Sequence, residues 1–204
     1  MGSGEGGGFG LRPSATHQGL ILLFDRFDQA VDCLTSKEVS LYRERTRELW
    51  QGVLRVKSCR GSWDEQSWLS QDLAIDPIPQ DKMVPYTASL TRASIRATKA
   101  VQFWRFAPQA QQDLQEAQGC ELAIGLGEAP LVRQCTFSIW RDAQSLVDYA
   151  HQGAHLKAIK AAQSHQFFNE SMFVRMDILH MHGQWMGKAF SANVLDAEAL
   201  SMNL

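Results

Sequence analysis

The histidines are the residues of this chain that most readily suggest chemistry. His151 and His155 lie four residues apart in a segment with helical periodicity, so both side chains would share one face of a helix. Paired histidines at this spacing often bind a metal ion, but no third ligand stands at a typical distance, which disfavours zinc. His155 also shares its face with Ile159 and Ala162. An imidazole there is a packed core or surface side chain, a haem ligand or a proton-transfer group, and the spacing leaves these alternatives open.

A second set of polar and aromatic residues has two interpretations each. His180 and His182 are two residues apart in a strand and have no acidic or thiol partner nearby in sequence, which favours a solvated strand face. Arg92 lies in a strand beside small and apolar residues, where its guanidinium either pairs with an acid or contacts an anionic or polarisable ligand. Several aromatic residues either pack in a core or line a pocket for a large apolar ligand: Trp104, Phe137, Trp140, Phe167 and Phe168.

Familiar catalytic signatures are missing from the sequence. It contains no nucleophile elbow, no zinc-protease helix and no dinucleotide fingerprint. The opening MGSGEGGGFG is rich in glycine, but it lacks the Lys-Ser/Thr ending of a phosphate-binding loop, so composition alone predicts a flexible leader. Most common enzyme classes are therefore disfavoured.

The composition describes an ordinary globular chain. Its 204 residues are 45% hydrophobic, which suffices for one large domain or two small packed ones. With 20 Lys and Arg against 22 Asp and Glu, no basic surplus indicates binding to nucleic acid or to an anionic membrane surface. The four scattered cysteines favour reduced thiols and a cytoplasmic location, and no run of about 20 apolar residues predicts a transmembrane segment.

The elements that would position these residues are clearest in the second half. We expect a strand at 88–95, a helix at 99–117, strands at 120–126 and 131–140 joined by a turn, a helix after the N-cap Asp142 that Gly153 breaks, and a strand at 173–182. This order of elements is that of a ferredoxin-like unit. Two such units side by side would make an α+β barrel.

The first half is less regular. We expect a short buried strand at 19–25, a helix at 27–34, a strand at 52–59 and a long irregular connection at 63–85, which holds three of the six prolines. The sequence thus predicts three regions. Residues 1–85 form a glycine-rich leader and the first half, residues 86–188 form the second half, and residues 189–204 form a tail with a weakly fixed helix or an arm.

Four segments of the second half resemble the spheroidene monooxygenase family. They are LTRASI at 90–95 with Phe103 and Trp104, IGLGEAP and QCTFSIW between 124 and 140, residues 155–159, and FFNESMFVRM at 167–176. Their order and spacing are similar to those of the family, and the glycine-rich opening followed by Phe9 looks like the family's glycine segment. The resemblance covers most of residues 2–180.

The resemblance implies an α+β fold, a dimeric-type α+β barrel made of two ferredoxin-like halves. It also implies a haem-dependent oxygenase that places a keto or hydroxyl group on an acyclic carotenoid. His155 matches the family's histidine and is the expected axial ligand of the haem iron. Arg92 and Trp104 match further positions of the pattern and are expected catalytic residues beside a haem propionate or the substrate. Electrons would come from a separate donor. Peripheral contact with a membrane and oligomerisation stay open.

The chain departs from the family pattern in two places. Family members usually have an additional strand, helix and strand before the glycine segment, whereas this chain starts with Met1 at that segment, so an incomplete first half is expected. Gln166 and Phe167 replace a Gly-Trp pair, and Met176 replaces a Phe, which predicts an altered pocket wall.

Two alternative functions differ in class from a haem oxygenase. One is a non-catalytic α+β barrel that binds haem or a hydrophobic small molecule, because a fold supports many functions and only the site decides among them. The other is a monooxygenase that uses no cofactor.

Overall fold

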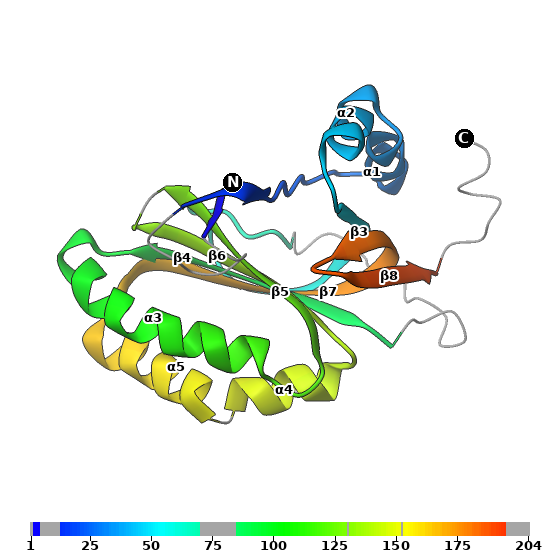
Figure 1. Ribbon diagram of the computed structural model, residues 1–204. Coiled ribbons are helices and arrows are strands. Elements are labelled where there is room, and N and C mark those ends of the chain that lie inside the picture. Colours follow the sequence, from blue (N-terminus) through cyan, green and yellow to red (C-terminus); the bar gives the residue numbers. More distant parts are fainter. Residues whose placement is uncertain (1, 5–12, 70–84, 130, 152, 195–204) are drawn as a thin grey trace. The chain divides into compact units, whose positions relative to one another are not determined.

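The computed structural model describes residues 2–4, 13–69, 85–129, 131–151 and 153–194 (Figure 1). The chain divides into two compact units, each composed of several stretches of sequence. The first comprises Met1–Leu20, Val56–Ala74 and Pro85–Met176, and the second comprises Ile21–Arg55, Ile75–Val84 and Asp177–Leu204. The domain boundary predicted at residue 86 and the separate tail predicted at residues 189–204 stay predictions.

The second half of the chain has the ferredoxin-like order that the sequence predicts. Its elements are β4 (Thr87–Ile95), a 3-10 turn (Ala97–Lys99), α3 (Ala100–Gln115), β5 (Cys120–Ala129), β6 (Arg133–Trp140), α4 (Ala143–His151), α5 (Gly153–His165) and β7 (Phe168–Trp185). In the sheet they follow the order β5-β6-β4-β7, and the pairs β4–β6 and β5–β6 are antiparallel. The α+β class and the ferredoxin-like unit are therefore confirmed.

Local signals in the sequence account for the helix boundaries of this unit. The carboxylate of Asp142 accepts a hydrogen bond from the Ser145 backbone N–H at 2.7 Å, so it caps α4 as predicted. Gly153 has a φ of +62° and separates α4 from α5, which confirms the predicted break.

Further strands extend the sheet on both sides. They are β1 (Gly2–Gly4), β2 (Pro13–Gln18), β3 (Trp50–Gly61) and β8 (Lys188–Asn193), giving the order β2-β1-β5-β6-β4-β7-β3, with β8 paired to β7. Residues 2–4 form a strand in which Gly2 and Ser3 pair antiparallel with Gly127 and Leu126 of β5, so they are not the flexible leader that composition alone indicates. Residues 5–12 of the glycine-rich opening lie outside the described residues.

Two glycines within strands, Gly61 of β3 and Gly183 of β7, lie against the backbone of a neighbouring segment. A Cβ on Gly61 would lie 2.0 Å from the Ser171 carbonyl oxygen in the first unit, and a Cβ on Gly183 would lie 1.9 Å from the Leu49 carbonyl oxygen in the second. Both have positive φ, of 80° and 120°. No other residue type fits either position without moving the neighbouring strand.

The structure corrects the expected strand at 19–25. Residues 19–24 have no regular secondary structure, and Leu22, Leu23 and Phe24 are exposed. A short apolar run specifies neither a partner strand nor burial, so periodicity alone misassigned it. The helix that follows is confirmed as α1 (Phe27–Leu34), and α2 (Lys37–Arg45) begins where Ser36 accepts the Val39 N–H.

The expected helix or arm from residue 189 is also corrected. Residues up to Asn193 form β8, which pairs antiparallel with β7 across a two-residue turn. Met186 and Gly187 occupy this turn with φ values of 50° and 79°, the conformation that matches the twist of a hairpin. Residues 195–204, and residues 70–84 of the expected irregular connection, lie outside the described residues.

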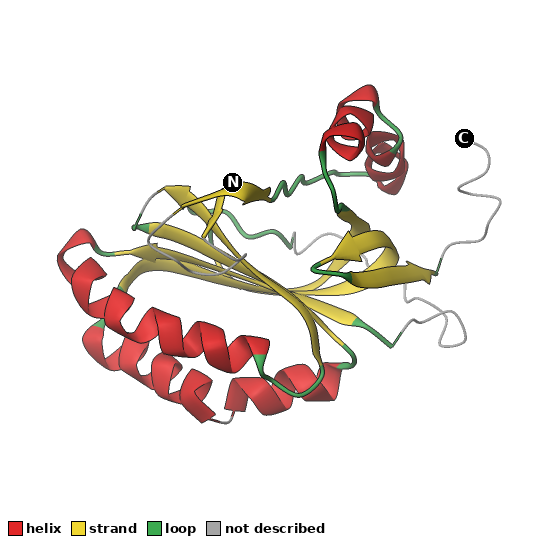
Figure 2. Cartoon of the chain, in the orientation of Figure 1, coloured by secondary structure: helices red, strands yellow, loops and turns green. Residues whose placement is uncertain are grey.

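In the first unit, α3, α4 and α5 all cover one face of the sheet (Figure 2). Among the described residues, no helix combines the length and apolar character needed to cross a membrane.

Candidate functional site

The face of the sheet beneath the helices carries small side chains at its centre. Trp140 clusters with Leu114 of α3 and Leu146 of α4, which identifies the even-numbered residues of β6 as helix-facing. The Trp140 indole Nε1 donates to the Ser138 hydroxyl at 2.9 Å on the same face. Strand register then places six helix-facing residues side by side, which we call the small-residue patch: Ser89, Thr91, Ala123, Gly125, Thr136 and Ser138.

Part of the small-residue patch is accessible although strands flank it and helices cover it. Ser89, Thr91, Ala123 and Thr136 are only half-buried. A closely packed helix–sheet interface would bury residues at these central positions. The partial accessibility means that the helices cover these small side chains incompletely.

The opposite face of the same strands carries large apolar side chains and is fully packed. Leu90, Leu122, Ile124, Leu126, Phe137 and Ile139 alternate with the small-residue patch, and each is at most 8% exposed. A Cβ on Gly19 would lie 2.7 Å from Leu126 Cδ2, so the chain at Gly19 rests directly on this face. We call these six residues the large-residue face.

Arg92 lies on the side of the large-residue face, next to Cys135 in the register. Its guanidinium forms an ion pair with Glu128, and both side chains are largely buried. The guanidinium carbon also lies 3.8 Å from the ring centroid of Trp63, a cation–π contact. Its Nε is buried without a hydrogen-bond partner among the described residues. Glu128 thus neutralises the guanidinium of Arg92. Arg92 therefore offers no unpaired positive charge to an anionic group of a ligand.

The loop after β3 holds Trp63 against Arg92. The Glu170 carboxylate accepts hydrogen bonds from the Asp64 and Glu65 backbone N–H groups at 3.0 Å each and from the Ser62 hydroxyl at 2.7 Å. These hydrogen bonds lower the pKa of Glu170, and the bond from the Glu65 backbone N–H contributes most. The loop is fixed at neutral pH because its anchor is ionised.

Cys135 is an inert thiol. It is 1% exposed, and burial raises its pKa to about 12, with the nearby charge of Arg92 acting in the opposite direction. Since the thiolate is the reactive form, this residue does not supply a nucleophile at neutral pH.

His155 lies on the other side of the sheet, within the helix layer. Its ring stacks on Tyr149 with a centroid distance of 4.5 Å, and Tyr149 packs on Trp140 at 5.1 Å. Burial lowers the pKa of His155, while the negative charge of Asp113 acts to raise it. We call the rings of Trp140, Tyr149 and His155 the aromatic column, which leads from the small-residue patch to α5.

Trp104 occupies a third place, on α3. Its indole Nε1 donates to the Leu131 carbonyl at 3.0 Å, and its ring meets Phe103 edge to face at 5.4 Å. The indole therefore ties α3 to the turn between β5 and β6.

The structure does not bring the three predicted site residues together. Arg92 is on the face opposite the helices, whereas His155 and Trp104 belong to the helix layer and make different contacts. Their predicted roles stay predictions. Sequence reasoning missed Glu128, Trp63 and Glu170, because their contacts join residues between 29 and 108 positions apart.

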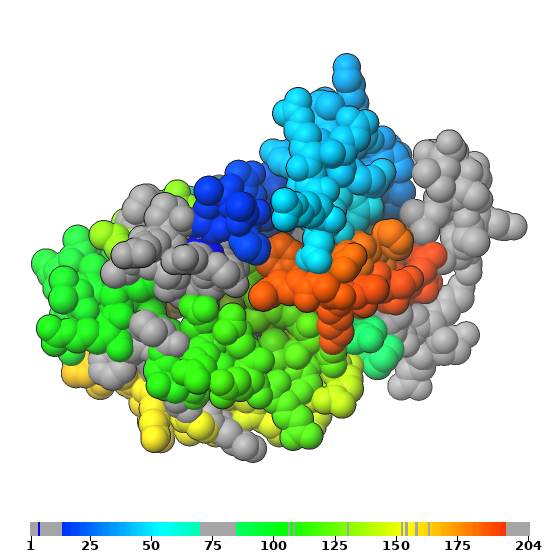
Figure 3. Space-filling view, viewed as in Figure 1, coloured from blue at the N-terminus to red at the C-terminus, as the bar shows by residue number. Residues whose placement is uncertain are grey.

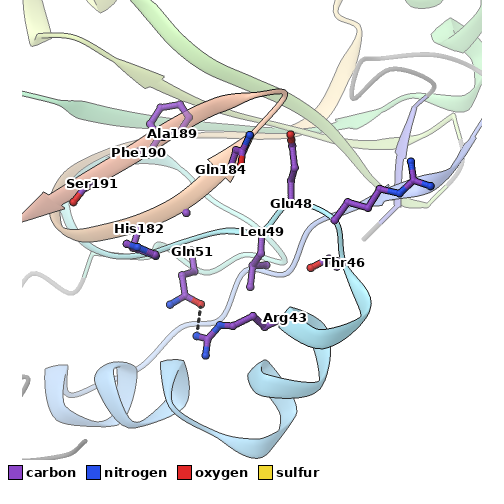
Figure 4. A pocket seen from close by; sticks show the side chains of 12 residues that line it. Arg43, Thr46, Glu48, Leu49, Gln51, His182, Gln184, Ala189, Phe190 and Ser191 are labelled. Carbon is purple, nitrogen blue, oxygen red and sulfur yellow. Dashed lines mark hydrogen bonds between the residues drawn. The ribbon is translucent and has the colours of Figure 1, made fainter.

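The second unit contains an open pocket of about 550 Å3 between the end of α2, the start of β3 and the β7–β8 hairpin (Figure 4). The guanidinium of Arg43 donates to the Gln51 side-chain oxygen at 3.3 Å, and Glu48 accepts the Gly187 N–H. His182, predicted to lie on a solvated face, is exposed and lines this pocket, whereas His180 is half-buried. Polar side chains dominate its wall, which does not suit a long apolar ligand.

Within the part of the chain that the structure describes, no three His, Cys, Asp or Glu side chains gather as a metal site would require.

Comparison with known proteins defines the class of the chain. No family model matches it. It is 47% identical to the spheroidene monooxygenase of Rubrivivax gelatinosus over 93% of this chain and 71% of that protein. It is 33% identical to that of Rhodobacter capsulatus, over 97% of this chain and 81% of that protein. The α+β fold and these relatives define an oxidoreductase of the monooxygenase class.

The chain belongs to the spheroidene monooxygenase family, as the sequence predicts. The protein from Cereibacter sphaeroides is a further relative, 31% identical over 92% of this chain and 57% of that protein. Among solved structures, the cofactor-independent oxygenase SnoaB from Streptomyces nogalater is 12% identical over 45% of this chain and 90% of that chain, with a TM-score of 0.38.

Proposed function

We propose that the chain is a monooxygenase that inserts oxygen into an acyclic carotenoid or a similar apolar polyene. The curated relatives that share its family carry the name spheroidene monooxygenase. The observation that carries the proposal is the identity of 47% and 33% to two such relatives, over 71% and 81% of their lengths.

Haem is the proposed cofactor, as the family resemblance implies, and the surroundings of His155 fit it. Because burial lowers the pKa of His155, the neutral imidazole that binds a metal prevails at neutral pH. Neither ring nitrogen makes a hydrogen bond to a described residue, so a nitrogen is available as a ligand. When bound, haem supplies the redox chemistry that activates dioxygen.

The chain's own residues orient and shield this site. The stack on Tyr149 fixes the plane of the His155 ring, and the Tyr149 hydroxyl donates to the Ala110 carbonyl at 3.4 Å, which joins α4 to α3. The helix layer covers the small-residue patch in part, because Ser138 is buried whereas Ser89 and Thr136 are partly accessible. Arg92, paired with Glu128, acts from the opposite face and supports the sheet rather than the reacting atoms.

The overall reaction balances with an external supply of electrons. One oxygen atom of dioxygen replaces hydrogen on carbon as a hydroxyl group, and the other leaves as water after taking up two electrons and two protons. A second round at the same carbon, followed by loss of water, yields a keto group. A separate electron donor, a cytoplasmic location and an oligomeric assembly belong to this proposal as well.

The test of the cofactor is an absorption spectrum of protein produced with haem precursor. We expect an intense Soret band that shifts when imidazole or carbon monoxide is added. His155→Ala should lose the band while circular dichroism shows that the fold is kept. The matched control is His151→Ala, because His151 is an exposed histidine of α4 whose ring bonds only to the Val147 carbonyl. Unchanged haem content in folded His155→Ala protein would remove His155 from the site.

The test of the reaction is turnover of a detergent-solubilised acyclic carotenoid under isotopically labelled dioxygen. Mass spectrometry should find labelled oxygen in the product. A Soret band without turnover would support the alternative of a haem-binding protein, and turnover in iron-free protein would support an oxygenase without a cofactor.

A further inference from the structure

The segment that follows β3 contains a turn whose residues do not favour its conformation. The Trp63 N–H donates to the Gln66 carbonyl at 2.8 Å, and the Gln66 N–H donates to the Trp63 carbonyl at 3.2 Å. The two residues between them, Asp64 and Glu65, have φ values of 51° and 66°. A two-residue turn with positive φ at both positions normally carries Asn-Gly or Asp-Gly, because glycine adopts this conformation without strain. Since Glu65 stands in place of glycine, other contacts must hold the turn.

Charged side chains of the sheet supply these contacts. On β7, the two oxygens of the Glu170 carboxylate accept the Asp64 and Glu65 N–H groups, one each, and one oxygen also accepts the Ser62 hydroxyl. On β6, Arg133 donates to the Asp64 carboxylate at 3.1 Å, but both side chains are exposed, so this ion pair is the weaker restraint. Glu170 is therefore the main restraint on the strained turn.

The turn places Trp63 over the Arg92–Glu128 ion pair. The guanidinium carbon of Arg92 lies 3.8 Å from the ring centroid of Trp63, which is buried, and 5.3 Å from that of Trp68. Residues 64–67 are exposed. These contacts lie on the side of the sheet opposite α3, α4 and α5, whose green and yellow surface Figure 3 shows. We call residues 62–68 the strap. It rests on the sheet through its two indoles and is open to solvent between them.

A segment of this kind opens at a low cost in free energy. Segments with exposed backbone hydrogen bonds and few buried apolar side chains are the first parts of a fold to open. Opening of the strap relieves the strain at Asp64 and Glu65 and returns the Glu170 carboxylate to water. Against this stands the loss of burial of Trp63.

We propose that residues 62–68 open and close as a unit over the Arg92–Glu128 pair, with Glu170 as the latch. In the closed state the strap hides the guanidinium and the indole of Trp63. In the open state both groups face solvent, while β3 and β7 stay paired because Gly61, at the end of β3, still lies against the Ser171 carbonyl. The strap is a conformational device of the first unit and does not depend on the cofactor or the substrate of the proposed function.

Acid releases the latch. The groups that face Glu170 are the Ser62 hydroxyl and the two N–H donors of the strap and, from β6, Arg133, which also pairs with Asp64. The hydrogen bond from the Glu65 N–H, above all, lowers the pKa of Glu170. The ionised carboxylate therefore holds the strap closed at and above the ordinary pKa of a glutamate, and this hold is lost as pH falls through the lowered value.

Hydrogen exchange of the full chain, resolved by residue with NMR, tests the latch. Glu170→Gln removes the charge and one of the two acceptor oxygens. We expect the amides of Asp64 and Glu65 to exchange about tenfold faster or more than in wild type, while the amides of β4 and β6 keep the wild-type rate. Unchanged exchange at Asp64 and Glu65 overturns the inference. So does an equal acceleration in β4 and β6, because Glu170 would then support the whole unit.

A second substitution separates turn strain from a general structural role. In the Glu170→Gln background, Asp64→Asn with Glu65→Gly supplies residues that favour positive φ. Exchange at both positions, corrected for intrinsic rates, should return to within about threefold of wild type, and absence of this rescue contradicts the inference. Glu48→Gln is the matched control, because Glu48 accepts the Gly187 N–H at 2.9 Å in a turn of the second unit. It should leave exchange of the strap amides unchanged.

Tryptophan fluorescence tests release by acid. The emission of Trp63 is obtained as the difference between wild type and Trp63→Phe. On acidification this emission should move to longer wavelength, as that of an indole entering water does, at a pH where circular dichroism is unchanged. Glu170→Gln should lack this step, because its amide does not titrate. A shift that coincides with the loss of circular dichroism would mean that the strap opens only when the unit unfolds, which contradicts the inference.

Discussion

The two faces of the central sheet are built from the same strands and differ in side-chain size and in accessibility. The small-residue patch lies under the helices of the first unit and is only partly buried, whereas the large-residue face lies on the opposite side of the sheet and is buried. Normally a helix layer packs the face that it covers. The difference predicts that truncations on the large-residue face destabilise the protein more than truncations on the small-residue patch.

The largest expected effect comes from truncating the large-residue face. Leu90→Ala should lower the free energy of unfolding by about 2–5 kcal/mol, because Leu90 is 1% exposed and its removal leaves a cavity. The neighbouring Ser89→Ala, on the small-residue patch, should change it by less than about 0.5 kcal/mol. Denaturant titration of both variants measures the difference. Equal losses would contradict the distinction between the faces.

The next effect concerns the ion pair beside the large-residue face. Glu128→Gln should lower the free energy of unfolding by roughly 1–3 kcal/mol, because it leaves the guanidinium of Arg92 without an acid. This is less than for a fully enclosed pair, since both side chains keep some contact with solvent. The double variant Arg92→Leu, Glu128→Leu should recover part of the loss. A purely catalytic Arg92 predicts instead that Glu128→Gln unfolds at the wild-type denaturant concentration.

Larger side chains test the same difference between the two faces of the sheet in the opposite direction. Ala88→Leu inserts a side chain where nothing is exposed and should destabilise the protein by about 1–3 kcal/mol. Thr91→Leu adds volume to the small-residue patch and should cost less than about 1 kcal/mol, while haem retention and turnover fall at least tenfold. Unfolding curves and the Soret band, measured on the same samples, test the two variants together. A Thr91→Leu protein with full haem content and activity would show that the patch holds no ligand.

The smallest expected effect is a pH dependence on the helix side. The pKa of His155 is lowered in the folded state, so the unfolded chain takes up the proton first as pH falls below about 6.5. The contribution of His155 to stability is therefore present above that pH and is lost as pH falls through the folded value. Melting temperatures of haem-free wild type and His155→Phe at neutral and mildly acidic pH measure it. The variant should lose less on acidification, and an identical loss would contradict the assignment.

The sequence predicts the ferredoxin-like unit well because its signals are local. The Asp142 cap and the Gly153 break follow from the conformational preference of one residue each, and outside this unit the helix at 27–34 follows from periodicity. The run at 19–25 does not, since apolar residues without a partner strand carry no information about burial. The Met-Gly turn before β8 also escaped prediction, because it lacks the usual Asn-Gly or Asp-Gly signal.

The candidate site was only partly predictable. The alternation of apolar and polar residues in 131–140 distinguishes a packed strand face from a more polar one. It does not indicate which of the two faces the helices cover. The pairing of Arg92 with Glu128 depends on the register of three strands. A pattern that names residues one at a time does not show that Arg92 and His155 stand on opposite faces, because that is a property of the folded sheet.

Gly61 and Gly183 bear on how the family tolerates mutation. Each glycine has a positive φ and lies against a backbone carbonyl, so geometry rather than polarity excludes every side chain. In a library that carries all single substitutions, these two positions should be depleted of variants as strongly as Ile139, although neither contributes a side chain to the core. Their replacement would disturb strand pairing itself, and no compensating change in side-chain volume elsewhere could restore it.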